Sequence, residues 1–206
     1  HGIFTFADNA KDAYSLIINY ISDYEKTLTK QKKKKIKQIK KTKFNFSTAD
    51  IAPILRGLLS EKNDNKFILN FKKNSKLDYF INGKDINRYS NEGTATPDHV
   101  IRVKPFPLVI SPKANCTLDE FKNLAEKKFK EYRKKYKKYF EANKKKTKEK
   151  KVMLDTSPRV ILIQNFGLFT VGDTLKAAKI AGDLTQTNAN VISSVEETSR
   201  YKFLSK

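Results

Sequence analysis

Apolar residues recur at steps of three and four in three parts of the chain, the spacing of one face of an α-helix. The first part follows Asp8, a good N-cap residue; the second follows the capping pair Thr117 and Glu120; the third follows Asp173. We predict three long helices, and the first stripe indicates a helix that faces a core. The face residues are Ala10, Ala13, Tyr14, Ile17, Ile18, Ile21, Tyr24 and Leu28, then Phe121, Leu124, Ala125, Phe129, Tyr132, Tyr136 and Phe140, then Leu175, Ala178, Ile180 and Leu184.

Short runs of β-branched and aromatic residues predict extended pieces between the helices. The strongest is Arg159–Ile163, which is unbroken like a buried central strand. A shorter helix is predicted for Ile51–Leu59, and the polar stretch 82–98 predicts a loop. The weaker extended candidates are Phe67–Phe71, Leu77–Ile81, His99–Val103 and Leu108–Ile110. This alternation of strands and helices predicts an α/β fold, a central sheet with helices on both faces.

Length and composition narrow the protein class. A chain of 206 residues can bury a sizeable core, and no run of about 18 apolar residues predicts a membrane span. The single Cys116 excludes an internal disulfide and a cysteine zinc site, which fits a reducing, cytoplasmic setting. The apolar start without an initiator Met suggests that the chain begins inside a longer polypeptide.

The net charge of +21 comes from two segments. Lys26–Lys43 holds ten lysines and no acid, and Lys122–Lys151 holds fifteen basic residues and four acids, so the rest of the chain is neutral. Such lysine density attracts nucleic acid or another anionic surface. Only six basic residues are Arg, the side chain suited to paired contacts with bases and phosphates. Solvated helix faces therefore explain the lysines better, and nucleic-acid binding stays the alternative.

One stretch of the sequence occurs twice. Gly2–Ala13 aligns without gaps to Gly167–Ala178, with six of twelve positions identical. Both copies lead from an apolar turn through an Asp to an apolar-striped helix, which favours two related domains with a shared layout at these two corners. The copies differ in chemistry, because His1 precedes the first and Phe166 precedes the second. An imidazole can bind a divalent metal, whereas a phenyl ring cannot.

The element from His1 to Asp8, with Ala10 and Ala13 beyond it, resembles the HG element of the class II aldolase/adducin family. Gly93–Arg102, Pro158–Phe169 and the ending from Glu196 resemble the second half of the aldolase region in bifunctional aldolase/short-chain dehydrogenases, such as rhamnulose-phosphate aldolase/alcohol dehydrogenases. The sequence departs from that pattern at Ala7, where the family has Gly. The resemblance implies a three-layer α/β/α fold, with a central mixed sheet flanked here by long Lys-rich helices.

The same resemblance implies a zinc-dependent aldolase that cleaves a sugar phosphate and forms a homo-oligomer. It makes His1 the last of three zinc ligands, 1–43 the strand-turn-helix end of a first aldolase-like domain, and 44–206 a degenerate second one. The family's H-x-H pair and acid/base Glu would precede His1, and no glycine-rich dinucleotide motif occurs in the chain. We therefore expect an incomplete protein, inactive alone and without tightly bound zinc or other cofactor, unless another polypeptide supplies the missing ligands.

Four residues of the polar loop region are candidates for a substrate site or a vestigial metal site: Thr96, Asp98, His99 and Arg102. His99 beside Asp98 could form an acid/base pair, but a loop histidine in an ordinary hydrogen bond is the favoured interpretation. Cys116 has no marked basic surroundings and is interpreted as structural rather than nucleophilic.

Overall fold

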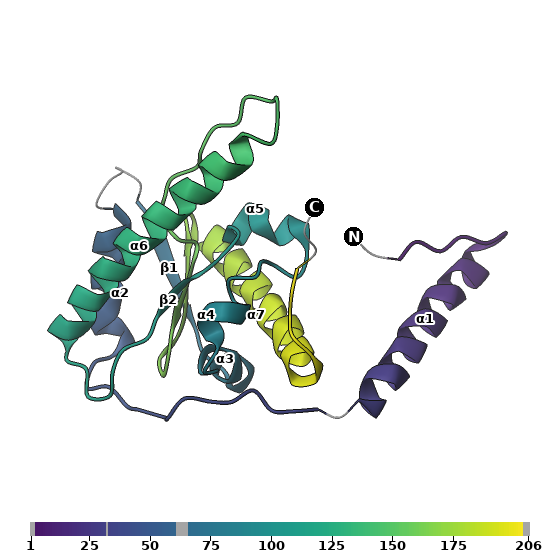
Figure 1. The fold of residues 1–206 in the computed structure, drawn as a ribbon, viewed down its shortest axis with the longest axis horizontal. Helices are drawn as coiled ribbons and strands as arrows, with labels where there is room; N and C mark the ends of the chain where they lie inside the picture. Colours follow the sequence, from purple (N-terminus) through teal and green to yellow (C-terminus); the bar gives the residue numbers. More distant parts are fainter. Residues whose placement is uncertain (1–2, 32, 61–65, 204–206) are drawn as a thin grey trace.

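The fold is built on a four-stranded mixed sheet (Figure 1). This computed structural model describes residues 3–31, 33–60 and 66–203. The strands lie in the order β1-β4-β3-β2. β4 pairs antiparallel with both neighbours, and β3 pairs parallel with β2. The strand bounds are β1, Ile68–Lys72; β2, Leu108–Ile110; β3, Val160–Ile163; and β4, Gly167–Gly172.

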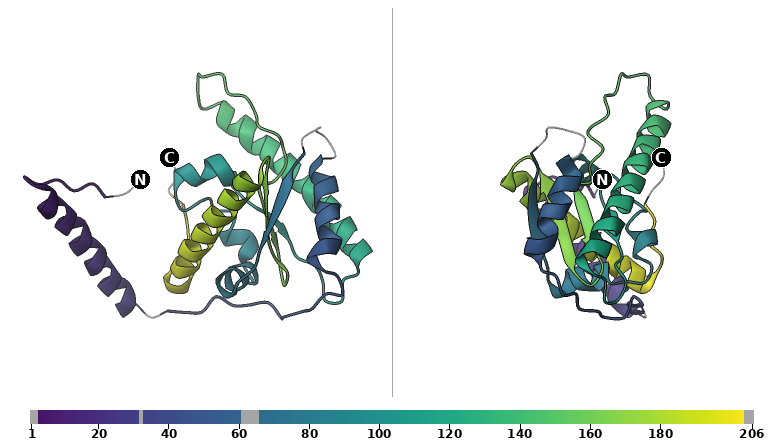
Figure 2. Two further views of the ribbon diagram at one scale, coloured as in Figure 1. Left: turned by 180° about the vertical axis from the view of Figure 1, so that it is seen from behind. Right: turned by 90° about the vertical axis from the view of Figure 1, so that its left-hand side faces the viewer.

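Helices cover both faces of the sheet, which confirms the three-layer α/β/α expectation (Figure 2). On one face α2 (Thr48–Ser60) and α6 (Leu118–Lys144) pack over Ile161 and Ile163 of β3. On the other, α3 (Ser75–Ile81), α4 (Ile86–Tyr89) and α7 (Leu175–Thr198) pack over Val160 and Leu162. The alternation of β3 side chains between two cores explains why its sequence is apolar at every position.

Several local predictions are confirmed. The Thr117 and Glu120 capping box opens α6, and its predicted apolar face is largely buried. β1, β2, β3 and α2 fall where their sequences indicate. The lysines gather on α6, whereas α7 carries only Lys176 and Lys179, so one of the two long flanking helices is Lys-rich.

Three predictions of strands or turns are wrong, and the stretch 82–98, predicted as a loop, contains the short helix α4. Leu77–Ile81 is helical because the Asn74 side chain accepts a hydrogen bond from the Leu77 N–H and starts α3. His99–Val103 is not extended, since the 3-10 turn η1 (Pro97–His99) continues directly into α5 (Val100–Val103). The stretch after Phe166, predicted as a turn, is β4, the strand that hydrogen-bonds to both β1 and β3.

The helix after Asp8 forms but does not face a core within the described residues. α1 (Ala10–Lys30) has no buried residue and stands apart from the sheet (Figure 1). Its cap is Asn9 rather than Asp8, and the cap of α7 is Thr174 rather than Asp173. Both corrections shift the helix start by the same single residue.

An extended segment, residues 33–45, connects α1 to the domain and lies along one end of it (Figure 1). Its backbone is held there by hydrogen bonds: the Lys34 N–H donates to the Glu197 carbonyl at 2.6 Å, and the Ile39 N–H donates to the Asn82 carbonyl at 2.8 Å. The Ile36 N–H donates to the Tyr79 hydroxyl at 2.8 Å. These bonds fix residues 34–39 to α3 and α7, so the chain is held to the domain shortly after the C-terminal end of α1.

Candidate functional site

The four candidate loop residues lie on η1 and α5 or directly before η1, and among their side chains only that of His99 forms a hydrogen bond with another described residue. Thr96, Asp98 and Arg102 are exposed to solvent, whereas His99 is partly buried. The His99 Nδ1 atom lies 3.0 Å from the Asn188 Oδ1 atom of α7. Asp98 and His99 therefore form no acid/base pair; the imidazole contacts an amide instead.

The hydrogen bonds of Asn188 define the tautomer of His99. The Ala95 N–H donates to the same Oδ1 atom at 2.9 Å, which marks that atom as the oxygen and an acceptor. The neutral His99 ring must then carry its proton on Nδ1 and keep a lone pair on Nε2. Asn188 thus fixes the loop at residues 95–99 onto α7.

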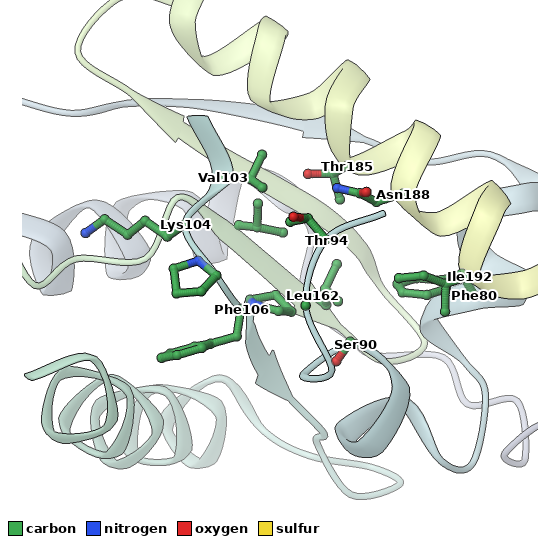
Figure 3. A pocket seen from close by; sticks show the side chains of 14 residues that line it. Phe80, Ser90, Thr94, Val103, Lys104, Phe106, Leu162, Thr185, Asn188 and Ile192 are labelled. Carbon is green, nitrogen blue, oxygen red and sulfur yellow. The ribbon is translucent and has the colours of Figure 1, made fainter. Parts of the chain in front are cut away.

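A pocket lies beside this contact, between α7, β3 and the segments around Thr94 and Lys104 (Figure 3). The space in it that is open to the centres of water-sized molecules is about 40 Å³, room for a few waters at most. The side chains of Phe80, Val103, Phe106, Leu162 and Ile192 make its surface mostly apolar. It is the kind of recess that holds a small apolar group rather than a charged one.

The polar groups of the pocket are mostly occupied by the protein itself. The hydroxyls of Ser90, Thr94 and Thr185 donate to the carbonyls of Ile86, Thr96 and Ala181, at 2.6, 2.7 and 2.6 Å. The Asn188 amide nitrogen forms no hydrogen bond with any described residue. Among the described residues that line the pocket there is no imidazole, carboxylate or thiol, so the pocket offers no acid/base chemistry of its own.

Lys104 lines the pocket with its backbone and points its ammonium group away from it (Figure 3). The Nζ atom donates to the carbonyls of Asp155 and Ser157, at 2.5 and 2.7 Å, and lies 4.3 Å from the centroid of the Tyr136 ring. Arg159 forms an ion pair with the Asp155 carboxylate. Burial lowers the pKa of Lys104 to about 8, because desolvation outweighs the attraction of Asp155.

The backbone of Lys104 is unusual as well. Its φ of 62° lies in the left-handed region, which costs a non-glycine residue on the order of 1–3 kcal/mol. The hydrogen bonds of the Lys104 ammonium group hold this conformation. They connect the segment at 155–159 to the residues just before β2. Neither Lys104 nor Asn188 was a candidate from the sequence, because their partners lie 51 and 89 or more positions away.

Phe166, the counterpart of His1 in the repeat, is part of an aromatic cluster in the core. Its ring is 9% exposed and its centroid lies 5.8 Å from that of Phe71, 6.0 Å from Phe46 and 6.3 Å from Phe169. The second corner is thus a packed interior, with no opening for a metal ion at that position.

The described residues do not fit a zinc ion. No group of three or more His, Cys, Asp or Glu side chains gathers among them. His1 lies outside the described residues. Cys116 is buried, its thiol donates to the Thr117 carbonyl at 3.4 Å, and burial raises its pKa, which agrees with a structural role. None of the helices in the described part of the chain is long and apolar enough to cross a membrane.

Comparison with known proteins agrees with this fold. Residues 46–206 match the family described as "Aldolase class II, second domain". An uncharacterized oxidoreductase of Bacillus subtilis, YuxG, is 25% identical over 193 residues, which cover 89% of this chain and 27% of that protein. No solved structure matches the chain. The chain spans about a quarter of that relative, and through the match over 46–206 it belongs to the class II aldolase family, as a second domain.

Proposed function

We propose that this chain is the non-catalytic half of a class II aldolase-type protein, a domain that supports assembly and contributes at most one metal ligand, His1. In this proposal residues 1–43 end a first aldolase-like domain and 44–206 form the second, degenerate one. The observation that carries it is the burial of Phe166: the corner equivalent to the one after His1 is filled by aromatic rings.

The reaction of the complete protein is part of the same proposal. It would be the cleavage of a sugar phosphate by a zinc-dependent, homo-oligomeric aldolase joined to a dehydrogenase. Zinc supplies Lewis-acid stabilisation of the oxygen that gains negative charge. The name of the Bacillus subtilis relative, an oxidoreductase, supports the dehydrogenase part. Thr96, Asp98, His99 and Arg102 remain candidates for a substrate or vestigial site only as part of that larger assembly.

Zinc titration of the isolated chain tests the proposal. Catalytic zinc requires about three protein ligands, and the chain has two histidines, His1 and His99. We expect no binding at micromolar zinc in calorimetry, and no aldol cleavage of sugar phosphates. His1→Ala and His99→Ala serve as matched variants. Micromolar binding that disappears in His1→Ala but persists in His99→Ala would contradict the proposal.

A second candidate function, binding to an anionic polymer, rests on the exposed lysines of α6 and of the following segment, Lys144–Lys151. A titration with duplex DNA at about 50 and 200 mM salt decides it, because several phosphate contacts would weaken binding by orders of magnitude between these concentrations. Binding that is tight at low salt and falls steeply supports this function. Weak binding at both concentrations leaves the lysines as a solvated surface.

A further inference from the structure

The two copies of the repeat make the same local contacts in the structure. α1 begins at Ala10 and α7 at Leu175, which are equivalent positions. The caps are equivalent too: the Asn9 side chain accepts from the Asp12 N–H, and the Thr174 side chain accepts from the Ala177 N–H. These caps leave the chain extended, with φ −143° and ψ 159° at Asn9 and φ −130° and ψ 159° at Thr174.

One further contact joins each helix to the stretch before it. The Thr5 hydroxyl donates to the Ala13 carbonyl at 2.7 Å, and the Thr170 hydroxyl donates to the Ala178 carbonyl at 2.7 Å. Both partners occupy equivalent positions in the alignment. The stretch before the helix is therefore joined to the first helical turn by the same hydrogen bond at both sites, which a chance similarity in sequence would not require.

In the second copy this unit is interior. Thr170 is fully buried on β4, which is paired on both sides, and α7 lies across β4 and β1. The α7 side chains that face the sheet include Ala178, Ala181, Thr185 and Ala189. Every residue of β4 is buried, so the strand is covered on both faces.

In the first copy the equivalent residues are open to solvent. Ile3, Phe4 and Phe6 are 63%, 88% and 89% exposed. The α1 residues equivalent to Ala181, Thr185 and Ala189 are Leu16, Tyr20 and Tyr24, and they are also exposed. A strand-like segment that is apolar on both faces, followed by a helix with aromatic and aliphatic residues at the sheet-facing positions, has the composition of an interior unit.

We infer that residues 3–30 are a docking unit: residues 3–7 enter a second sheet as an interior strand, and α1 covers that sheet through Ala13, Leu16, Tyr20 and Tyr24. The occupant of this surface is a sheet-bearing domain of the same protein outside residues 1–206. A second copy of the chain does not fit, because its own β4 already fills the place between β1 and β3. The matched segment covers only 27% of the Bacillus subtilis relative, which leaves ample polypeptide for such a domain there.

The two units differ in how closely helix and strand approach. A Cβ on Gly172 would lie 2.4 Å from the Ala178 backbone nitrogen, and one on Gly182 would lie 3.1 Å from the Asn70 side chain. The first copy has Ala7 and Ile17 at these positions. The docked α1 must therefore stand farther from its sheet than α7 does, with the larger Leu16, Tyr20 and Tyr24 filling the wider gap.

Hydrogen exchange tests the inference, which deepens the domain division proposed above. The 206-residue chain is compared with the protein expressed from its complete reading frame. We expect amides of residues 3–7 and 13–24 to exchange rapidly in the 206-residue chain and at least about 100-fold more slowly in the complete protein, as paired strands and packed helices do. β4 and α7 are the internal control and stay protected in both.

Three outcomes overturn the inference. Residues 3–24 that exchange rapidly in the complete protein exclude docking. Protection of the 206-residue chain that rises with its concentration assigns the surface to a second copy, and protection that appears only with phosphatidylserine vesicles assigns it to a membrane surface. Each result is independent of zinc binding, so it leaves the test of the proposed function unaffected.

A pair of matched substitutions identifies the face. Tyr20 and Tyr14 are 56% and 66% exposed on α1, but Tyr20 is equivalent to the buried Thr185 and Tyr14 to the exposed Lys179. In the complete protein we expect Tyr20→Ser to speed exchange in residues 3–7 at least tenfold and Tyr14→Ser to leave it unchanged. Equal effects of the two substitutions contradict the assigned face.

Discussion

The corner at residues 3–30 and the corner at 167–198 start a long helix with the same cap and the same threonine–carbonyl hydrogen bond, yet one is exposed and the other is buried. The comparison separates two levels of structure. Local sequence determines where the helix starts, because caps and short-range hydrogen bonds involve residues eight or fewer positions apart. Burial depends on the sheet: β4 pairs with β3, which directly precedes it in the chain, and also with β1, whose residues lie about 100 positions away. The following substitutions test this separation.

The largest effect is expected from removing the ring at the second corner. Phe166→Ala deletes a nearly buried side chain from a cluster with Phe46, Phe71 and Phe169, and substitutions of this kind cost about 3–5 kcal/mol. Urea unfolding should show this loss in the free energy of unfolding. Phe4→Ala is the control, since its ring is 88% exposed, and it should change that free energy by less than about 0.5 kcal/mol.

The glycine at the end of β4 gives the next largest effect. Gly172→Ala places a Cβ against the backbone of α7, so either the helix or the strand must move, at a cost of about 1–3 kcal/mol. The reciprocal substitution at the first corner, Ala7→Gly, should leave the unfolding transition in place, because Ala7 is exposed. A comparable shift from both substitutions would show that the two corners are packed alike.

The pH dependence of the free energy of unfolding is the next test, because Lys104 is buried in the domain that contains the second corner. The pKa of Lys104 falls from its usual 10.5 to about 8 on folding, so between these values the unfolded chain holds a proton that the folded chain has lost. The free energy of unfolding should therefore rise with pH from about 8 to 10, by at most about 1.4 kcal/mol per unit. Burial raises the pKa of Tyr89, so stability should fall again above pH 10.

The control for that series is Lys104→Met, which removes the titrating group while Asp155, Arg159 and Tyr136 remain around the site. Urea unfolding of this variant should lose the rise between pH 8 and 10 and keep the fall above 10. A rise of unchanged slope would assign it to other groups.

The smallest effect concerns the hydrogen bond that both corners share. Thr170→Val removes a buried hydroxyl and leaves the Ala178 carbonyl without that donor, which should lower the free energy of unfolding by about 1–2 kcal/mol. Thr5→Val makes the same change at the exposed corner, where water can replace the hydroxyl, and should have no measurable effect on domain unfolding. If Thr5→Val is equally destabilising, the first corner is coupled to the domain.

The sequence predicted the parts of the fold that depend on short-range signals. The capping box at Thr117 and the unbroken apolar run of β3 were identified correctly because each signal lies within the element itself. Leu77–Ile81 was assigned to a strand from its aromatic and branched residues, although Leu77, Phe80 and Ile81 have the spacing of a buried helix face. β4 was missed because the stretch after Phe166 was assigned to a turn, although the turn itself ends where β4 begins, at Gly167, and β4 pairs back onto β3 as a hairpin.

The candidate site was less predictable than the fold. His99 was selected as a rare residue type in a polar loop, but its partner, Asn188, lies in the middle of a helix with no local signal of a special role. The pocket and the buried Lys104 arise where α5, α7 and the segment at 155–159 meet. The periodicity of apolar residues along the chain does not predict which distant segments come into contact.

The backbone bonds of residues 34–39 limit how far α1 can reach. The chain is anchored where the Lys34 N–H donates to the Glu197 carbonyl, and α1 ends at Lys30, only four positions before this anchor. The 21 residues of α1 span about 32 Å along the helix axis. A domain that receives the apolar face of α1 must therefore lie within roughly 45 Å of Lys34, on the same side of the protein as the last turn of α7.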